Sequence, residues 1–219
     1  MTFTLNAIII AGCLLLFIAI NLHNLLRHHA GFSTTTERPP ETVKPMAFPL
    51  LLAGVGTGAF FLESFLYVLL AFPNNLPPVL STLGFGKNQM ALLEPLGLLV
   101  MVLGYAIFIW SVIARGRYAT SWQMPANHKL VDWGPYRYVR HPSYSGYFLM
   151  FIGFLLLWHN LLAIVPLIAI PGYALITHHE EEMLLTRFGD KYLTYRKNVG
   201  GFVPRMRMRT SGDSEDLRS

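Results

Sequence analysis

The chain alternates long apolar runs with short polar segments. Five of the runs approach or exceed the length needed to cross a bilayer core of about 30 Å. We expect transmembrane helices at Leu5–Leu26, Met46–Phe72, Leu93–Ala114, Tyr144–Trp158 and Leu161–Thr177. The fourth run is short for a bilayer, so its start is expected to lie partly within protein. The pattern predicts an all-α integral membrane protein.

The fourth and fifth runs are joined only by His159 and Asn160. So short a connection predicts a tight helical hairpin. The end of the fifth run should then return beside the start of the fourth.

The second run is long enough to tilt and carries several small residues. Gly54, Gly56 and Gly58 are expected to offer a close-packing face. Glu63 lies in the same run, where an ionised carboxylate costs at least several kcal/mol unless it is paired or reaches water. Either a protonated Glu63 makes an interhelical hydrogen bond, or the residue has a function that the sequence does not identify.

The basic residues of the segments between the runs predict an orientation. The four segments that connect the runs carry, in chain order, three, one, five and no Lys or Arg residues. The region after the fifth run carries eight. This alternation places the N-terminus outside or in a lumen and the C-terminus in the cytoplasm. The net charge of +5 is therefore a topology signal, and we expect no nucleic-acid partner. The first run has no basic segment before it and no obvious cleavage site after it, so we expect it to remain as a helix.

Composition agrees with this interpretation. Hydrophobic residues make up 53% of the chain and charged residues 13%, against about 25% charged in soluble proteins. The single cysteine, Cys13, excludes an intrachain disulfide and a cysteine-based metal site.

The segment after the fifth run predicts two short helices. Glu180–Glu182 should open the first, which Gly189 closes near Phe188. Asp190 should cap a second helix, whose apolar side carries Tyr192, Leu193 and Tyr195. We expect three parts: membrane helices in 1–115, a catalytic region with the hairpin in 116–205, and a disordered tail in 206–219.

The densest polar cluster, VRHPSYSGYF, directly precedes the fourth apolar run. His141 and Tyr144 are three residues apart and share a helix face. Pro142 fits the first helical turn, whose free N–H groups can hold an anion. The hairpin brings Glu180–Glu182 to the same volume, beside Arg140 and the lipid boundary. Convergent polar groups beside an apolar wall suit one polar and one lipid-like substrate.

Other site types lack their motifs. The histidines form no HExxH or comparable metal pattern, so a metal site is not expected. GxGxxG, GxxxxGK[ST] and a GxSxG triad arrangement are also missing from the sequence.

Two segments, HKLVDWGPYRYVRHPSYSGYF and EEEMLLTRFGDKYLTYRKNVGGFVP, carry a family resemblance between Ser121 and Arg205. Their order and spacing resemble the integral-membrane methyltransferases, which comprise the isoprenylcysteine carboxyl methyltransferases, their bacterial relatives and the phospholipid N-methyltransferases. The resemblance implies S-adenosylmethionine as methyl donor, bound in a cytoplasm-facing cavity that the C-terminal region caps. Carried onto this sequence, the cofactor site comprises His128, Leu130, Val131, Gly134, Tyr136, His141, Pro142, Tyr144, Glu180 and Glu181.

The acceptor would be lipophilic, a prenylcysteine or a phospholipid-like molecule that enters from the bilayer. For a carboxylate acceptor, Arg140 is the candidate positioning cation. For an amine acceptor, Tyr144 or a glutamate such as Glu181 could take the proton. Carboxyl methyltransferases of this family tend to have an arginine near the end of the last span, where this chain has His178 and His179.

Three alternatives stay open. The acceptor could be a phospholipid or small molecule methylated on nitrogen or sulfur. An NADPH-dependent sterol reductase shares part of the RHPxY pattern but has about twice as many spans. A non-enzymatic scaffold that binds lipid head groups would tolerate substitution of Glu180 and Glu181.

Overall fold

The structure, a computed structural model, describes residues 2–31, 47–71, 80, 82–85, 92–116 and 129–205. These residues form α1 (Thr2–Gly31), α2 (Ala47–Ala71), α4 (Leu93–Arg115), η3 (Gly134–Arg137), α5 (Pro142–Trp158), η4 (Leu161–Ile168), α6 (Ala169–Phe188) and α7 (Asp190–Asn198). In this part of the chain, β-type pairing is confined to two isolated bridges. The predicted all-α class is confirmed.

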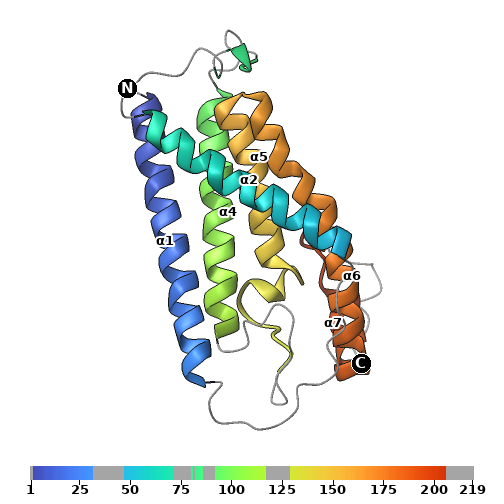
Figure 1. Cartoon of the computed structure of the whole chain (residues 1–219). Helices are drawn as coiled ribbons and strands as arrows, with labels where there is room; N and C mark the ends of the chain where they lie inside the picture. Colours follow the sequence, from blue (N-terminus) through green and yellow to red (C-terminus); the bar gives the residue numbers. More distant parts are fainter. Residues whose placement is uncertain are drawn as a thin grey trace, which may run out of the picture.

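Four stretches are long and apolar enough to cross a membrane: α1, α2, α4 and the continuous run of η4 and α6. The remaining predicted span, the fourth, is α5, which has 17 residues, about 26 Å at 1.5 Å per residue. It lies at the centre of the bundle (Figure 1), and its Met150, Phe151 and Phe154 are fully buried. Pro142 and Ser143 in its first turn are also buried. As expected, the short helix begins within protein.

Paired glycines hold α4 against α5, the most extensive helix contact in the described residues. A Cβ on Gly97 would lie 2.7 Å from the carbonyl oxygen of Gly153, and one on Gly104 would lie 2.6 Å from that of Gly146. On each helix the two glycines are seven residues apart, which is close to two turns. The absence of side chains at these four positions allows the two backbones to touch.

Small residues also join α2 to α6. Gly56 lies against Ala169, and Gly172 lies against Ala53. The prediction of a close-packing face was right for Gly56 and wrong for Gly54 and Gly58, since a Cβ there would meet nothing within 4 Å. The reason is helical geometry: two residues turn the helix by about 200°, so glycines spaced by two point to opposite sides.

Glu63 is 7% exposed on the buried face of α2. Its Oε2 has no hydrogen-bond partner among the described residues. The interhelical hydrogen bond, one of the two alternatives for Glu63, is therefore not made by this oxygen in that part of the chain.

The predicted hairpin forms, although its two arms diverge. His159 adopts φ 41°, and the Asn160 side chain caps the next turn by accepting a hydrogen bond from Leu162 N at 3.0 Å. From this turn, α5 packs along α4, whereas α6 packs along α2. Tyrosine side chains fill the space between the arms: the ring of Tyr173 stacks 4.5 Å from Tyr144 and 5.4 Å from Tyr147, measured between centroids.

Helix α6 continues unbroken to Phe188. The prediction that Glu180–Glu182 open a new helix was wrong, because no Gly or Pro interrupts the chain between Ile176 and Phe188. Gly189, with φ 50°, ends the helix as predicted. Asp190 begins α7 but makes no capping bond, because Gly189 occupies the N-cap position. Residues 206–219, predicted to form a tail, lie outside the described residues.

The end of α4, the start of α5, the end of α6 and all of α7 gather at one end of the bundle (Figure 1). The run from Leu161 to Phe188 has 28 residues, about 42 Å if helical throughout. This exceeds a hydrocarbon core of about 30 Å. The last turns of α6 therefore extend beyond the apolar layer at this end.

Candidate active site

A carboxylate from α6 gathers three positively charged or protonatable side chains. Glu181 Oε1 accepts hydrogen bonds from Arg140 Nε at 2.9 Å and pairs with its Nη2 at 2.8 Å. The same oxygen lies 3.0 Å from His141 Nε2. Glu181 Oε2 lies 3.3 Å from Arg196 Nε of α7. Glu181 is 9% exposed, so its charge is stabilised by these partners rather than by water.

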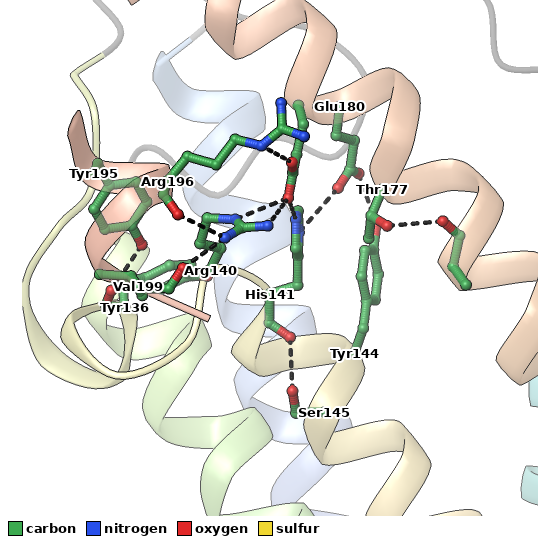
Figure 2. Close-up of polar contacts among 12 residues, drawn as sticks. Tyr136, Arg140, His141, Tyr144, Ser145, Thr177, Glu180, Tyr195, Arg196 and Val199 are labelled. Carbon is green, nitrogen blue, oxygen red and sulfur yellow. Dashed lines mark hydrogen bonds and ion pairs between the residues drawn. The ribbon is translucent and has the colours of Figure 1, made fainter. Parts of the chain in front are cut away.

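Glu180, the preceding residue, is less fully engaged. The Tyr144 hydroxyl donates to its Oε1 at 2.7 Å (Figure 2). Its Oε2 lies 3.6 Å from His141 Nδ1, beyond ordinary hydrogen-bond distance. His141 thus lies between two carboxylates, with its ring parallel to that of Tyr144 at 5.9 Å between centroids. The network joins the start of α5 to the last turns of α6, as the hairpin predicted.

The segment after α7 packs against the start of α5. The N–H groups of Arg140 and His141 donate to Gly200 O at 2.8 Å and Gly201 O at 3.0 Å. Ser145 Oγ donates to Phe202 O at 2.7 Å, and the ring of Phe202 lies 5.7 Å from His141. We call residues 199–202 the C-terminal strap; it covers one side of the polar network.

Tyrosines connect α7 to η3. The Tyr195 hydroxyl donates to Tyr136 O at 2.7 Å (Figure 2). Burial raises the pKa of Tyr136, Tyr192 and Tyr195. These phenols therefore stay protonated at neutral pH.

Five of the residues singled out from the sequence meet in the network: Arg140, His141, Tyr144, Glu180 and Glu181. Pro142, the first residue of α5, is buried beneath it.

The other predicted residues lie along the approach to α5. Leu130 and Val131 are buried in the extended segment before η3. Gly134 has φ 60°, and a Cβ there would lie 2.9 Å from Ala114 Cβ. Tyr136 is buried between η3, α4 and α5, where its phenol bonds to Ser111 and Ser143. His128 lies outside the described residues.

Arg140 has a different environment from the one expected of an acceptor-binding residue. Its Nη1 donates to Val199 O at 2.5 Å and Arg196 O at 3.2 Å, while Nε and Nη2 contact Glu181 (Figure 2). All three guanidinium nitrogens are thus engaged with α6, α7 and the strap. Arg140 ties the C-terminal segment to the site, and this geometry does not support its predicted role of positioning an acceptor.

Sequence reasoning missed three contributors. Arg196 pairs with Glu181, Tyr173 stacks on Tyr144, and Arg115 donates to Ser143 Oγ at 3.2 Å. A signal existed only for Arg115, which follows Ser111 by four residues and so shares its helix face.

Comparisons with known proteins agree with the sequence motifs. Residues 93–191 match the sequence model of the phospholipid methyltransferase family. The protein-S-isoprenylcysteine O-methyltransferase of Tribolium castaneum is 32% identical over 130 residues, which cover 54% of this chain and 44% of that protein. Its counterpart in Schizosaccharomyces pombe is 38% identical over 80 residues, 36% of this chain and 34% of that protein. The chain thus matches less than half the length of these two relatives.

A solved structure of the eukaryotic intramembrane Ras methyltransferase, an isoprenylcysteine carboxyl methyltransferase, is 25% identical. The comparison covers 74% of this chain and 54% of that one, with a TM-score of 0.48. The family matches confirm the resemblance predicted from the two sequence segments.

Proposed function

We propose that the protein transfers a methyl group from S-adenosylmethionine to a lipophilic acceptor in the membrane, because residues 93–191 match the sequence model of the phospholipid methyltransferase family. The observation that carries the proposal is the network of His141, Tyr144, Glu180 and Glu181, which lies inside the matched region and at the end of the membrane helices. The names of the relatives favour an isoprenylcysteine-type carboxylate as acceptor.

The side chains present suit this cofactor, which supplies a methyl group on a positively charged sulfur. Among the described residues, the ion-pair contact of Glu180 Oε2 is the 3.6 Å one with His141, so this oxygen can accept hydrogen bonds from ribose hydroxyls or an ammonium group. Glu181 already has three partners and instead holds His141 in place.

The remaining contacts are assigned by the resemblance and by position. His141 and the first turn of α5 bind the cofactor carboxylate, since the free N–H groups there carry partial positive charge. The adenosine part would be bound along the approach to α5 by His128, Leu130, Val131 and Gly134. The strap covers this site from the C-terminal side.

The protein contributes mainly alignment. The bound cofactor would supply an electrophilic methyl group on sulfur, and the site would hold the acceptor's carboxylate oxygen in line with the carbon–sulfur bond, so that a methyl ester would form as that bond breaks and its electrons pass to sulfur. No proton needs to be removed, and holding two reactants in line can supply as much as about 7–11 kcal/mol. We place the site on the cytoplasmic side, where the basic segments lie, with the acceptor entering between helices from the bilayer.

A phospholipid amine is the second candidate acceptor. An amine must lose a proton when it is methylated. The Tyr144 hydroxyl, which donates to Glu180 at 2.7 Å, forms a pair through which that proton could pass. This pair is the observation that keeps N-methylation as the alternative.

Replacing Glu180 by glutamine tests the cofactor assignment. We expect Glu180→Gln to weaken binding of S-adenosylhomocysteine at least tenfold, since it removes a charged acceptor whose hydrogen bonds contribute about 1.5–3 kcal/mol. The Tyr144 contact can be kept by the amide oxygen, so the fold should remain. Isothermal titration of the full chain in detergent micelles measures the dissociation constant.

Glu182→Gln is the matched control. Glu182 follows on the same helix, but its side chain is 61% exposed and its ion pair within the described part of the chain is with the exposed His178. Its replacement should leave the dissociation constant unchanged. If both variants and the native protein bound S-adenosylhomocysteine equally well, Glu180 would not be a cofactor-binding residue. A native protein that binds neither S-adenosylmethionine nor S-adenosylhomocysteine would refute the proposed function.

A further inference from the structure

A second polar cluster lies where α4 ends, next to the network described above. It comprises Arg115 and Ser111 of α4, Ser143 in the first turn of α5, and Tyr136 of η3. Ser111 Oγ and Ser143 Oγ are 2.7 Å apart, and the phenol of Tyr136 bonds to both serines. Ser111 is fully buried, while Tyr136 and Ser143 are 7% and 8% exposed.

Arg115 is the positively charged member, and among the described residues much of its hydrogen-bonding capacity is unused. Its Nη2 donates to Ser143 Oγ at 3.2 Å. Its Nε is buried and has no acceptor in the described part of the chain. No carboxylate lies within ion-pair distance of it among those residues, and residues 117–128, which follow it, contain no Asp or Glu.

This arrangement is costly without a ligand. A buried donor left unsatisfied costs about 1–3 kcal/mol, and more when it is charged. Arg140 provides the comparison within the same molecule, since all three of its nitrogens have partners. Among the described residues, Arg115 is therefore a guanidinium with a buried donor that has no acceptor.

The surroundings of Arg115 favour an anion. The first turn of α5, which contains Ser143, has no side-chain cap and adds the partial positive charge of its free N–H groups. The hydroxyls of Ser143 and Tyr136 can turn their protons towards an oxygen ligand. The guanidinium is also near enough to the network to act electrostatically on Glu180 and Tyr144. A planar guanidinium with hydroxyl donors matches a carboxylate.

We propose that Arg115, with Ser143 and Tyr136, binds the carboxylate of a reactant in the methyl transfer. The inference rests on the proposed function, in which both the acceptor and S-adenosylmethionine carry a carboxylate. The proposal places a carboxylate-binding arginine on α4. Arg140 is engaged by the C-terminal segment, and the end of the last span, where carboxyl methyltransferases of this family tend to have an arginine, carries His178 and His179. Arg115 would fix the reactant by charge and hydrogen bonds, without itself exchanging a proton.

The test compares Arg115→Gln, Arg115→Lys and the control Arg137→Gln in the full chain. Arg137 is exposed on η3 at the same end of the bundle, so its loss removes the same charge without touching the cluster. The first arm measures binding of S-adenosylhomocysteine and of 5′-methylthioadenosine, which lacks the amino-acid end. The second measures KM at saturating S-adenosylmethionine for N-acetyl-S-farnesylcysteine or for a membrane lipid extract, whichever the native protein methylates.

Arg115→Gln should change one of these quantities at least tenfold, with a smaller change for Arg115→Lys and none for Arg137→Gln. A raised acceptor KM with unchanged nucleoside binding assigns the site to the acceptor. Weaker S-adenosylhomocysteine binding with unchanged methylthioadenosine binding assigns it to the cofactor.

The inference is overturned if Arg115→Gln matches the native protein in both arms, or if it weakens both nucleosides equally. If Arg115→Gln cannot be purified folded, Arg115→Lys decides by the same criteria, since it keeps the charge but lacks the planar fork. A native protein that binds no cofactor and methylates neither acceptor would refute the proposed function itself. A native protein that is active while the Arg115 variants behave normally would refute only this inference.

Discussion

Gly153→Leu should abolish the folded protein. A Cβ at this position would lie 2.7 Å from Gly97 O and closer still to the backbone of Met101. These are backbone atoms of α4, so no side chain can rotate away, and α4 and α5 would have to separate. Overpacking usually costs about 1–3 kcal/mol, and we expect more here because the most extensive helix contact would open. Size-exclusion chromatography of the detergent-solubilised protein should show aggregate in place of the native peak.

Gly54→Leu is the matched control, since it places the same side chain on a membrane helix. Gly54 is exposed and has nothing within 4 Å of an added Cβ. This variant should elute as the native protein does and melt at the same temperature or slightly higher, because leucine is a better helix former than glycine. A folded, thermally stable Gly153→Leu protein would show that the two helices do not pack as described.

Glu181→Gln should release α7 and the strap from the site. Arg140 and Glu181 have side chains only 15% and 11% exposed, so removing the carboxylate leaves a largely buried guanidinium without a counter-charge. Breaking such a pair costs on the order of 3 kcal/mol, about a hundredfold in the docking equilibrium. The contact with Arg196 adds little, since that side chain is 47% exposed.

Hydrogen exchange of the Arg140 and His141 amides measures this release, because both donate to the strap at Gly200 and Gly201. Their exchange should accelerate about a hundredfold in Glu181→Gln, together with that of α7, and cofactor binding should be lost as well. Glu182→Gln should exchange as the native protein does. If the two amides stayed equally protected in Glu181→Gln, the strap would be held by other contacts and the ionic network would be incidental to it.

Much of the site followed from chain connectivity. A two-residue turn at His159 and Asn160 requires the start of one helix to meet the end of the next, so His141 could be placed near Glu181 across 40 residues. The short fourth run also correctly predicted a helix that begins within protein. These predictions depend only on helix length and turn length, which the order of apolar and polar residues determines.

The role of Arg140 could not be predicted in this way. Its partners include backbone carbonyls at Arg196 and Val199, whose positions depend on the path of the chain after Gly189. Backbone acceptors have no sequence signature. Arg140 therefore looked free to bind a substrate, and only the folded C-terminal segment shows that its nitrogens are engaged.

Helix faces were predictable only where spacing was considered. The glycines at 54, 56 and 58 formed a cluster in sequence but not on one face of α2. By contrast, Gly97 with Gly104 and Gly146 with Gly153 have a spacing of seven that keeps them on one face. Their function requires knowing that α4 and α5 are neighbours, which the sequence does not state.

Methyl transfer itself tests the central claim most directly. Membranes containing the native protein, or Glu180→Gln, would be incubated with methyl-labelled S-adenosylmethionine, and the extracted lipids treated with alkali. We predict label in the lipid extract of the native sample, well above that of Glu180→Gln, and its release by alkali as volatile methanol from a methyl ester. Label that resists alkali would show that the acceptor is an amine or a thiol rather than a carboxylate. The same incubation would be repeated with N-acetyl-S-farnesylcysteine added as an acceptor. If the native membranes then still carried no more label than those with Glu180→Gln, the proposed function would be contradicted.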